Sequence, residues 1–226
     1  NTERRLELSL GRYLSKHVAR QLAESDDDFI APKIMPNVVI MIGDIRGFTN
    51  YSKQHNPSDV AVFLNQYFNL VNTSIEAHGG VLNKFLGDGF LAIFGLFDID
   101  NAPEKASVAA GCDILEASRQ HLATQSLSMG LALSRGSVIA GEIGSEGRCE
   151  YTVIGDAVNI AARVEGLNRR LDTHFLVQRE FLEALPEGWV NTERVGVHNI
   201  RGMDEPLELF QVLSCEGASL APTQMN

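Results

Sequence analysis

The order of apolar runs and helical segments is the feature that most restricts the folds open to this chain. An apolar, β-rich run is followed by a long helical segment, two runs that flank a glycine turn, and a second long helix, over residues 37–42, 57–77, 81–94 and 102–121. A hairpin placed between two helices gives the order βα-ββ-αβ, which is typical of the split βαβ unit. We therefore predict an α+β, ferredoxin-like core.

The C-terminal part of the chain extends this core with an extra helix and strands. The pattern predicts a strand pair that turns at Arg135-Gly136, an extended arm, a helix and three short strands, over 127–133 with 137–143, 151–154, 156–168, 175–177, 195–200 and 207–212. We place this single domain at residues 34–214. Leucines at helical spacing predict a linker helix over 1–28 that arrives from an upstream region, and residues 215–226 are predicted to form a disordered tail.

The acidic balance of the chain excludes several classes of partner. The formal net charge is -10 and the sequence pI is about 5.0, which suits neither nucleic acid nor an anionic membrane. No apolar run reaches about 18 residues, so no membrane span is predicted. We expect no nucleic-acid partner, no membrane contact by this part of the protein and a cytoplasmic location, while membrane association of the full-length protein stays open. Cys112, Cys149 and Cys215 lack zinc-ligand spacing and are expected to be indifferent thiols in a reducing compartment.

Two aspartates beside glycines are the candidate metal ligands. Asp44 follows the first apolar run and Asp88 lies at the tip of the hairpin. In a ferredoxin-like sheet the first strand lies beside the hairpin, so both carboxylates can reach one point, and Mg²⁺ prefers such oxygens. The alternative is that each aspartate caps its own turn. Residues 45–49 form a glycine turn suited to presenting amides to phosphate, and Arg46 within it is expected to point to solvent.

Two further pairs have open interpretations. Asn159 and Arg163 are four residues apart on a predicted helix and share a face. There they either orient a sugar and stabilise phosphoryl charge, or form a solvated surface. Lys84 precedes Asp88 by four residues. It either forms a salt bridge with Asp88 or serves a different site, which one chain arranges only through dimerisation.

Three motifs occur in order along the chain: Asp44-Ile45-Arg46-Gly47-Phe48-Thr49, the stretch from Lys84 to Asp88, and Tyr151-Thr152-Val153-Ile154-Gly155-Asp156-Ala157-Val158-Asn159-Ile160-Ala161-Ala162-Arg163. They resemble the catalytic domain of class III nucleotide cyclases, and the likeness runs from about Val38 to Val212. The resemblance implies a head-to-tail homodimer with active sites at its interface. Residues 11–15 look like the linker that precedes such domains in bacterial multidomain cyclases, which implies upstream sensor domains.

The resemblance assigns roles to both protomers. Asp44 and Asp88 of one protomer would hold two Mg²⁺ or Mn²⁺ ions, with the Ile45 carbonyl as an extra ligand and Gly47, Phe48 and Thr49 against the substrate. The partner protomer would supply the residues that read the base, position the ribose, stabilise the transition state and contact the terminal phosphates, which are Lys84 with Thr152, Asn159, Arg163 and Arg201. The base pocket would be lined by Leu86, Val153 and Val158.

Within this resemblance, Lys84 and Thr152 decide the substrate. Guanylate-forming relatives have Glu and Cys at these positions, whereas Lys donates to adenine N1 and a Thr hydroxyl accepts from N6. The resemblance therefore implies an adenylate cyclase, a signalling domain that converts ATP to 3′,5′-cyclic AMP and pyrophosphate by in-line attack of the ribose 3′-oxygen on the α-phosphorus. Many adenylate cyclases have Asp in place of Thr152. The Thr branch is similar to cyclases stimulated by bicarbonate, so bicarbonate sensitivity is predicted.

Three other functions are compatible with an α+β core of this kind, and the sequence argues against each. A nucleotide-sensing module would lack a metal or transition-state residue, and none of these is missing from the chain. A diguanylate cyclase would carry a Gly-Gly-Asp/Glu-Glu-Phe signature, which does not occur. An RNA-binding domain would need surface aromatics and a basic face, which the acidic pI opposes.

Overall fold

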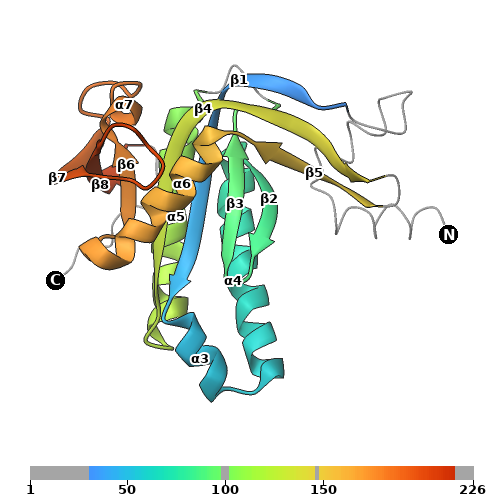
Figure 1. Ribbon diagram of the computed structural model, residues 1–226. Coiled ribbons are helices and arrows are strands. Elements are labelled where there is room, and N and C mark those ends of the chain that lie inside the picture. The colour runs from blue at the N-terminus through green and yellow to red at the C-terminus, as the bar shows by residue number, and fades with distance from the viewer. Residues whose placement is uncertain (1–30, 98–101, 146–147, 217–226) are drawn as a thin grey trace.

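The computed structural model describes residues 31–97, 102–145 and 148–216 (Figure 1). The predicted linker helix over 1–28 lies outside the described residues, as does nearly all of the predicted tail. The last strand includes Cys215, so regular structure extends one residue past the predicted domain boundary.

The described residues form one eight-stranded sheet. Its order is β2-β3-β1-β4-β6-β8-β7, with β5 paired to β4. Every pairing is antiparallel except that of β4 with β6. The strands are β1 (Lys33–Arg46), β2 (Val81–Leu86), β3 (Gly89–Phe94), β4 (Ser128–Ser145), β5 (Arg148–Ile154), β6 (Phe175–Gln178), β7 (Val190–His198) and β8 (Leu207–Cys215).

Helices cover both faces of this sheet (Figure 1). They are α3 (Phe48–Gln54), α4 (Pro57–Ala77), α5 (Pro103–Ala123), α6 (Asp156–Leu171) and α7 (Arg179–Leu182). Helix α4 begins with proline at its first position, where the missing amide hydrogen costs nothing. It buries Phe63, Tyr67, Val71 and Ile75, which recur every four residues and so form one face. The order β1-α4-β2-β3-α5-β4 confirms the predicted ferredoxin-like core.

Residues 38–42 of β1 are buried on both faces of the sheet, which explains why this part of the strand is entirely apolar. Val39 and Met41 pack into the core beneath α4 and α5. Val38 and Ile40 point the other way, into a second core that includes residues of β5 and α6. A strand covered on both sides has no solvent face and therefore shows no polar alternation.

The prediction of two strands that turn at Arg135-Gly136 is wrong, because the single strand β4 continues through these residues. Both stay paired with β1, Gly136 opposite Val38 and Arg135 opposite Val39. The glycine is needed for packing, since a Cβ at Gly136 would lie 3.1 Å from the Cβ of Ala157 on α6. The long strand then continues into a hairpin with β5.

The C-terminal strands also differ in extent from the prediction. Strand β7 starts at Val190, five residues before the predicted strand, and ends at His198. Its pairing with β8 shifts twice, once between Asn191 and Thr192 and once between Arg194 and Gly196, so the strand lacks the regular alternation that sequence patterns detect. Across the described ranges, no helix is long and apolar enough to cross a membrane.

Candidate active site

Asp44 and Asp88 lie close together at the C-terminal end of β1. Strand β1 pairs with β3 as far as Gly43 opposite Phe90, so the next residue lies beside the turn that joins β2 to β3. Gly87 forms this turn with a φ of 69°, a left-handed conformation that favours glycine. The two carboxyl groups share a hydrogen bond. We refer to Asp44 and Asp88 as the acidic pair.

Burial and mutual repulsion make the acidic pair receptive to positive charge. Burial, with the nearby charge of Asp88, raises the pKa of Asp44 to about 6. Burial also raises the pKa of Asp88 above its ordinary range. Their shared hydrogen bond raises the pKa of Asp44 and lowers that of Asp88. A pair of this kind is stabilised by a proton or by a metal cation.

The surroundings of the acidic pair fit divalent cations completed by substrate. A Cβ at Gly89 would lie 2.7 Å from the Gly43 carbonyl oxygen and 3.1 Å from Asp44 Oδ1, so glycine keeps the space beside this carboxylate open. Within the described residues, no group of three or more His, Cys, Asp or Glu side chains gathers at one point. Mg²⁺ is commonly held in this way, by one or two carboxylates together with phosphate oxygens and water.

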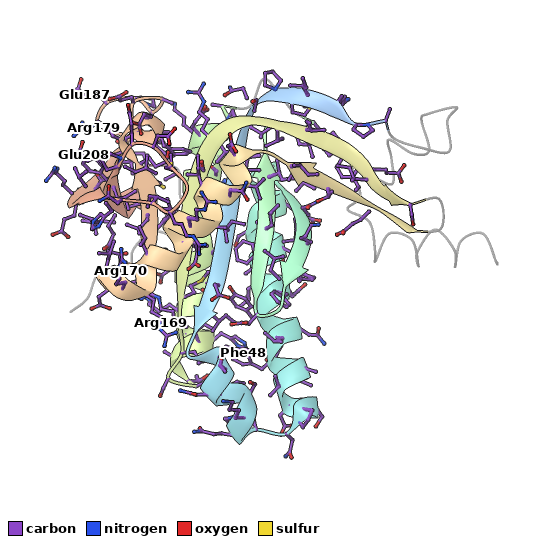
Figure 2. The ribbon with its side chains drawn as sticks, in the orientation of Figure 1. Phe48, Arg169, Arg170, Arg179, Glu187 and Glu208 are labelled. Carbon is purple, nitrogen blue, oxygen red and sulfur yellow. The ribbon has the colours of Figure 1, made fainter. Side chains whose placement is uncertain are left out.

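The glycine turn after β1 lies next to the acidic pair. Gly47 has a φ of 83° and precedes α3, and its carbonyl accepts hydrogen bonds from the amides of Asn50 and Tyr51 at 3.1 Å each. Gly47 and Thr49 are exposed, whereas Phe48 is half-buried. Figure 2 shows Phe48 beside the lower end of β1. The turn therefore presents its backbone to solvent at the same end of the strand as Asp44.

Lys84 turns toward β5 and away from Asp88. Its Nζ lies 2.9 Å from Oε1 of Glu150, and Asn83 Nδ2 donates to the carbonyl of Tyr151 at 3.0 Å. Glu150 and Thr152 are two residues apart on β5, so their side chains share a face. Lys84 therefore forms its salt bridge with Glu150, and the interpretation in which it pairs with Asp88 is wrong.

The three residues expected to line a base pocket differ in exposure. Leu86 is half-exposed at the end of β2, and Val158 is half-buried near the start of α6. Val153 is buried in the core shared by β1, β5 and α6.

Asn159 and Arg163 lie on α6, and both side chains are exposed. A Cβ at Gly202 would lie 3.0 Å from Nη1 of Arg163, so the guanidinium rests against the turn that contains Arg201. Gly202 has a φ of 77°, which favours glycine for the backbone as well as for the space. The structure thus brings the Arg163 guanidinium against the Arg201 turn, on the helix that also carries Asn159.

The candidate residues form separate groups within one chain. Across the described residues, no hydrogen bond or salt bridge joins Lys84, Asn159 or Arg163 to the acidic pair. Each group is positioned by its own neighbours: Glu150 for Lys84, and the Arg201 turn for Arg163. Within one chain, the candidate residues therefore form separate groups on β1 with the β2–β3 turn, on β2 with β5, and on α6.

The structure adds Glu165, which the sequence reasoning did not single out. Gly130 is the residue of β4 that pairs with Asp44, and a Cβ there would lie 2.5 Å from Oε1 of Glu165. The Glu165 carboxylate thus lies against the strand residue paired with a candidate metal ligand. Burial, followed by the charge of Asp44, raises its pKa to about 7, while Arg46 opposes the shift.

Arg46 was expected to point to solvent, and this expectation is wrong. Its Nη2 donates to the carbonyl oxygen of Thr173, and the residue is half-buried. Thr173 Oγ1 in turn donates to Oδ1 of Asn168 at 3.0 Å.

Helical spacing could have located Glu165, because it follows buried Ala161 by four residues and precedes buried Asn168 by three.

The fold and this arrangement of acidic, basic and glycine residues define a nucleotide cyclase catalytic domain. The chain belongs to the adenylate and guanylate cyclase catalytic domain family, whose sequence model matches residues 30–214. It is 29% identical over 184 residues to an adenylate cyclase of Anabaena cylindrica, covering 77% of this chain. It is 34% identical over 200 residues to an uncharacterized protein of Mycobacterium tuberculosis, covering 88% of this chain. The chain spans only 36% of the length of either relative.

Solved structures of both nucleotide specificities share the fold. A bacterial light-regulated adenylyl cyclase superposes with a TM-score of 0.80 at 27% identity, covering 93% of this chain and 61% of that one. The guanylyl cyclase Cya2 superposes with a TM-score of 0.73 at 30% identity, covering 84% of this chain and 98% of that one. Similarity alone therefore leaves the base that this chain reads undecided.

Proposed function

We propose that this domain is an adenylate cyclase that converts ATP to 3′,5′-cyclic AMP and pyrophosphate. The observation that carries the proposal is the contact of Lys84 on β2 with Glu150 on β5. Thr152 shares a strand face with Glu150, and Lys84 does not neutralise the acidic pair. A lysine ammonium donates to the N1 acceptor of adenine, and a threonine hydroxyl accepts from the N6 amino group. Guanine presents a donor at N1, which Lys84 would oppose.

The acidic pair fits two divalent cations, Mg²⁺ or Mn²⁺, with the Ile45 carbonyl as a further ligand. When bound, such ions lower the pKa of the ribose 3′-hydroxyl and offset charge on the phosphates. Asp44 and Asp88 contribute by holding their carboxylates together in a half-buried turn, where each has a raised pKa that a cation reverses.

The complete site needs a second copy of the chain. In the proposed head-to-tail homodimer, the acidic pair of one protomer faces Lys84, Thr152, Asn159 and Arg163 of its partner. The separation of these groups within one chain supports this arrangement. So do exposed apolar side chains next to the candidate residues, namely Phe85, Leu86 and Ile154, which are 51%, 49% and 54% exposed.

Each remaining residue positions part of the substrate. Asn159 holds the ribose, so that the 3′-oxygen attacks the α-phosphorus in line with the departing pyrophosphate. A new bond forms between the 3′-oxygen and phosphorus as the bond from phosphorus to the bridging oxygen breaks. Arg163 stabilises the negative charge that develops, Arg201 contacts the terminal phosphates, and residues 47–49 present backbone amides to them.

Regulation and cellular context are also proposals. Thr152 in place of the more common Asp supports stimulation by bicarbonate. Upstream sensor domains would set the geometry of the two protomers, and the domain would act in the cytoplasm whether or not the full protein is anchored to a membrane.

The test is product formation from ATP and from GTP, each with Mg²⁺ and with Mn²⁺. Cyclic AMP from ATP, with GTP at least tenfold poorer, is the expected result. Cyclic GMP from GTP as the main product would favour the second candidate function, that of a guanylate cyclase. The 30% identity to the guanylyl cyclase Cya2 is the observation that supports this second candidate. ATP binding without turnover of either nucleotide would indicate a sensing module. Bicarbonate added at constant pH should raise turnover, and an unchanged rate would remove that part of the proposal.

A further inference from the structure

Two cysteines that are far apart in sequence meet on the side of the domain formed by α5 and β8. Cys112 lies in the middle of α5, and Cys215 ends β8, 103 residues later. The Cys215 thiol donates a hydrogen bond to Cys112 Sγ, and the two sulfurs are 3.3 Å apart. A disulfide bond is about 2.05 Å long. Small side-chain rotations would therefore bring the sulfurs to bonding distance without moving either backbone element far.

A cavity gives reagents access to both sulfurs. It has a volume of about 540 Å³, lies between α5 and the strands β4, β6 and β8, and is lined by both cysteines. Its floor is apolar and includes Leu122 and Met129, while Glu116 and Arg119 lie on α5 at its edge. None of the candidate active-site residues lines it. The thiol pair is thus accessible from a surface that is separate from the active site.

We propose that Cys112 and Cys215 are an oxidation site that forms a reversible intramolecular disulfide on exposure to a peroxide. The inference does not depend on the proposed nucleotide specificity. It differs from the expectation of indifferent thiols, because sequence spacing contains no sign that residues 112 and 215 touch.

The chemistry balances with hydrogen peroxide as the oxidant. One cysteine, as its thiolate, attacks a peroxide oxygen, the O–O bond breaks, and a sulfenic acid and one water result. The second thiol attacks the sulfenic sulfur, the S–S bond forms, and the hydroxyl leaves as a second water. Two sulfurs lose one electron each, and the peroxide gains both. The hydrogen bond from Cys215, together with burial, raises the pKa of Cys112.

The cross-link would tie the last strand of the sheet to α5. Because it closes a loop of about a hundred residues, it restricts the unfolded chain strongly. For a chain of this size, the usual stabilisation by a disulfide corresponds to a rise in melting temperature of about 5–10 °C. Reduction should reverse the rise completely.

The experiment is intact-mass analysis and peptide mapping of the protein, reduced and then treated with hydrogen peroxide. The expected result is a loss of about 2 Da, a linked pair of peptides containing residues 112 and 215, and the rise in melting temperature. Cys149→Ser is the matched control and should behave as the unaltered protein does, whereas Cys112→Ser and Cys215→Ser should lose both signals. Separate oxidation of the two sulfurs, a cross-link between chains, or an unchanged mass would each overturn the proposal. Because mapping uses the unaltered protein, poor folding of a variant would not obscure the answer.

Discussion

Replacing Asp44 by asparagine should make the metal-free protein more stable while removing its activity. The pKa of Asp44 is about 6 in the folded protein, against an ordinary 3.8, so folding favours the protonated form. Its contribution to stability is therefore present below about pH 4 and is lost as pH rises through 6. A difference of about 2 pH units corresponds to about 3 kcal/mol, and screening at this half-buried site reduces the expected effect to about 1–2 kcal/mol.

Asparagine keeps the shape of the side chain and removes the charge. At pH 8 we expect Asp44→Asn to raise the melting temperature of the metal-free protein by about 2–8 °C. At pH 4 the two proteins should differ much less, because Asp44 is then almost fully protonated in the folded protein and pH 4 lies close to its ordinary pKa of 3.8 in the unfolded chain. Thermal unfolding monitored by circular dichroism across this pH range measures the effect.

Metal ions should reverse the order of stability. They bind the ionised carboxylate, and with a pKa of about 6 only about a tenth of Asp44 is ionised at pH 5, against nearly all at pH 8. The apparent affinity for Mg²⁺ or Mn²⁺, measured with a non-cyclisable ATP analogue, should therefore fall about tenfold from pH 8 to pH 5. Asp44→Asn should lose most metal-induced stabilisation and all measurable turnover.

A surface carboxylate provides the control for charge alone. Glu187 is exposed, and Figure 2 shows it far from Phe48, which follows Asp44 by four residues. Glu187→Gln should therefore leave stability, metal binding and turnover unchanged. A lower melting temperature of metal-free Asp44→Asn at pH 8 would show that the ionised carboxylate does not destabilise the fold. Normal metal-dependent turnover in the variant would show that Asp44 does not hold the metal.

Three further predictions concern the other groups of the site. Arg163→Ala should lower kcat by about 100-fold or more with little change in KM, because its charge acts on the transition state; an effect on KM alone would contradict this role. Lys84→Glu combined with Thr152→Cys should shift the product from cyclic AMP toward cyclic GMP, measured by chromatography of both products, and an unchanged preference for ATP would refute the base-reading assignment. The pKa of Glu165 is about 7, above its ordinary 4.5, so its contribution to stability is lost as pH rises through 7. Glu165→Gln should therefore flatten the dependence of melting temperature on pH between 5 and 8, and an unaltered curve would show that the carboxylate is not destabilised by burial.

Local patterns were sufficient where one segment determines its own structure. The buried run of β1, the proline-started α4 and the glycine turn that carries Asp88 were each readable from a few adjacent residues. Spacing also placed Asn159 and Arg163 on one helical face. The order of helices and strands along the chain was enough to predict the ferredoxin-like core, because few sheet arrangements accommodate a hairpin between two helices.

Local patterns failed where a distant neighbour decides the structure. Gly136 reads as a turn residue, yet it is a strand residue whose missing side chain admits Ala157 of α6. Arg46 reads as a surface charge, yet its guanidinium reaches the carbonyl of Thr173, 127 residues later. No property of either residue type predicts which partner the fold brings to it.

Residue types at short, regular spacings are enough to predict the elements, their order, the acidic pair and the membership of the cyclase catalytic domain family. Three contacts emerge only when the chain is folded, namely Lys84 with Glu150, Glu165 with the strand residue paired to Asp44, and Cys112 with Cys215. The physical reason is that each of these contacts joins side chains from elements separated by tens of residues. Their proximity follows from how the helices pack on the sheet, which short-range spacing does not encode.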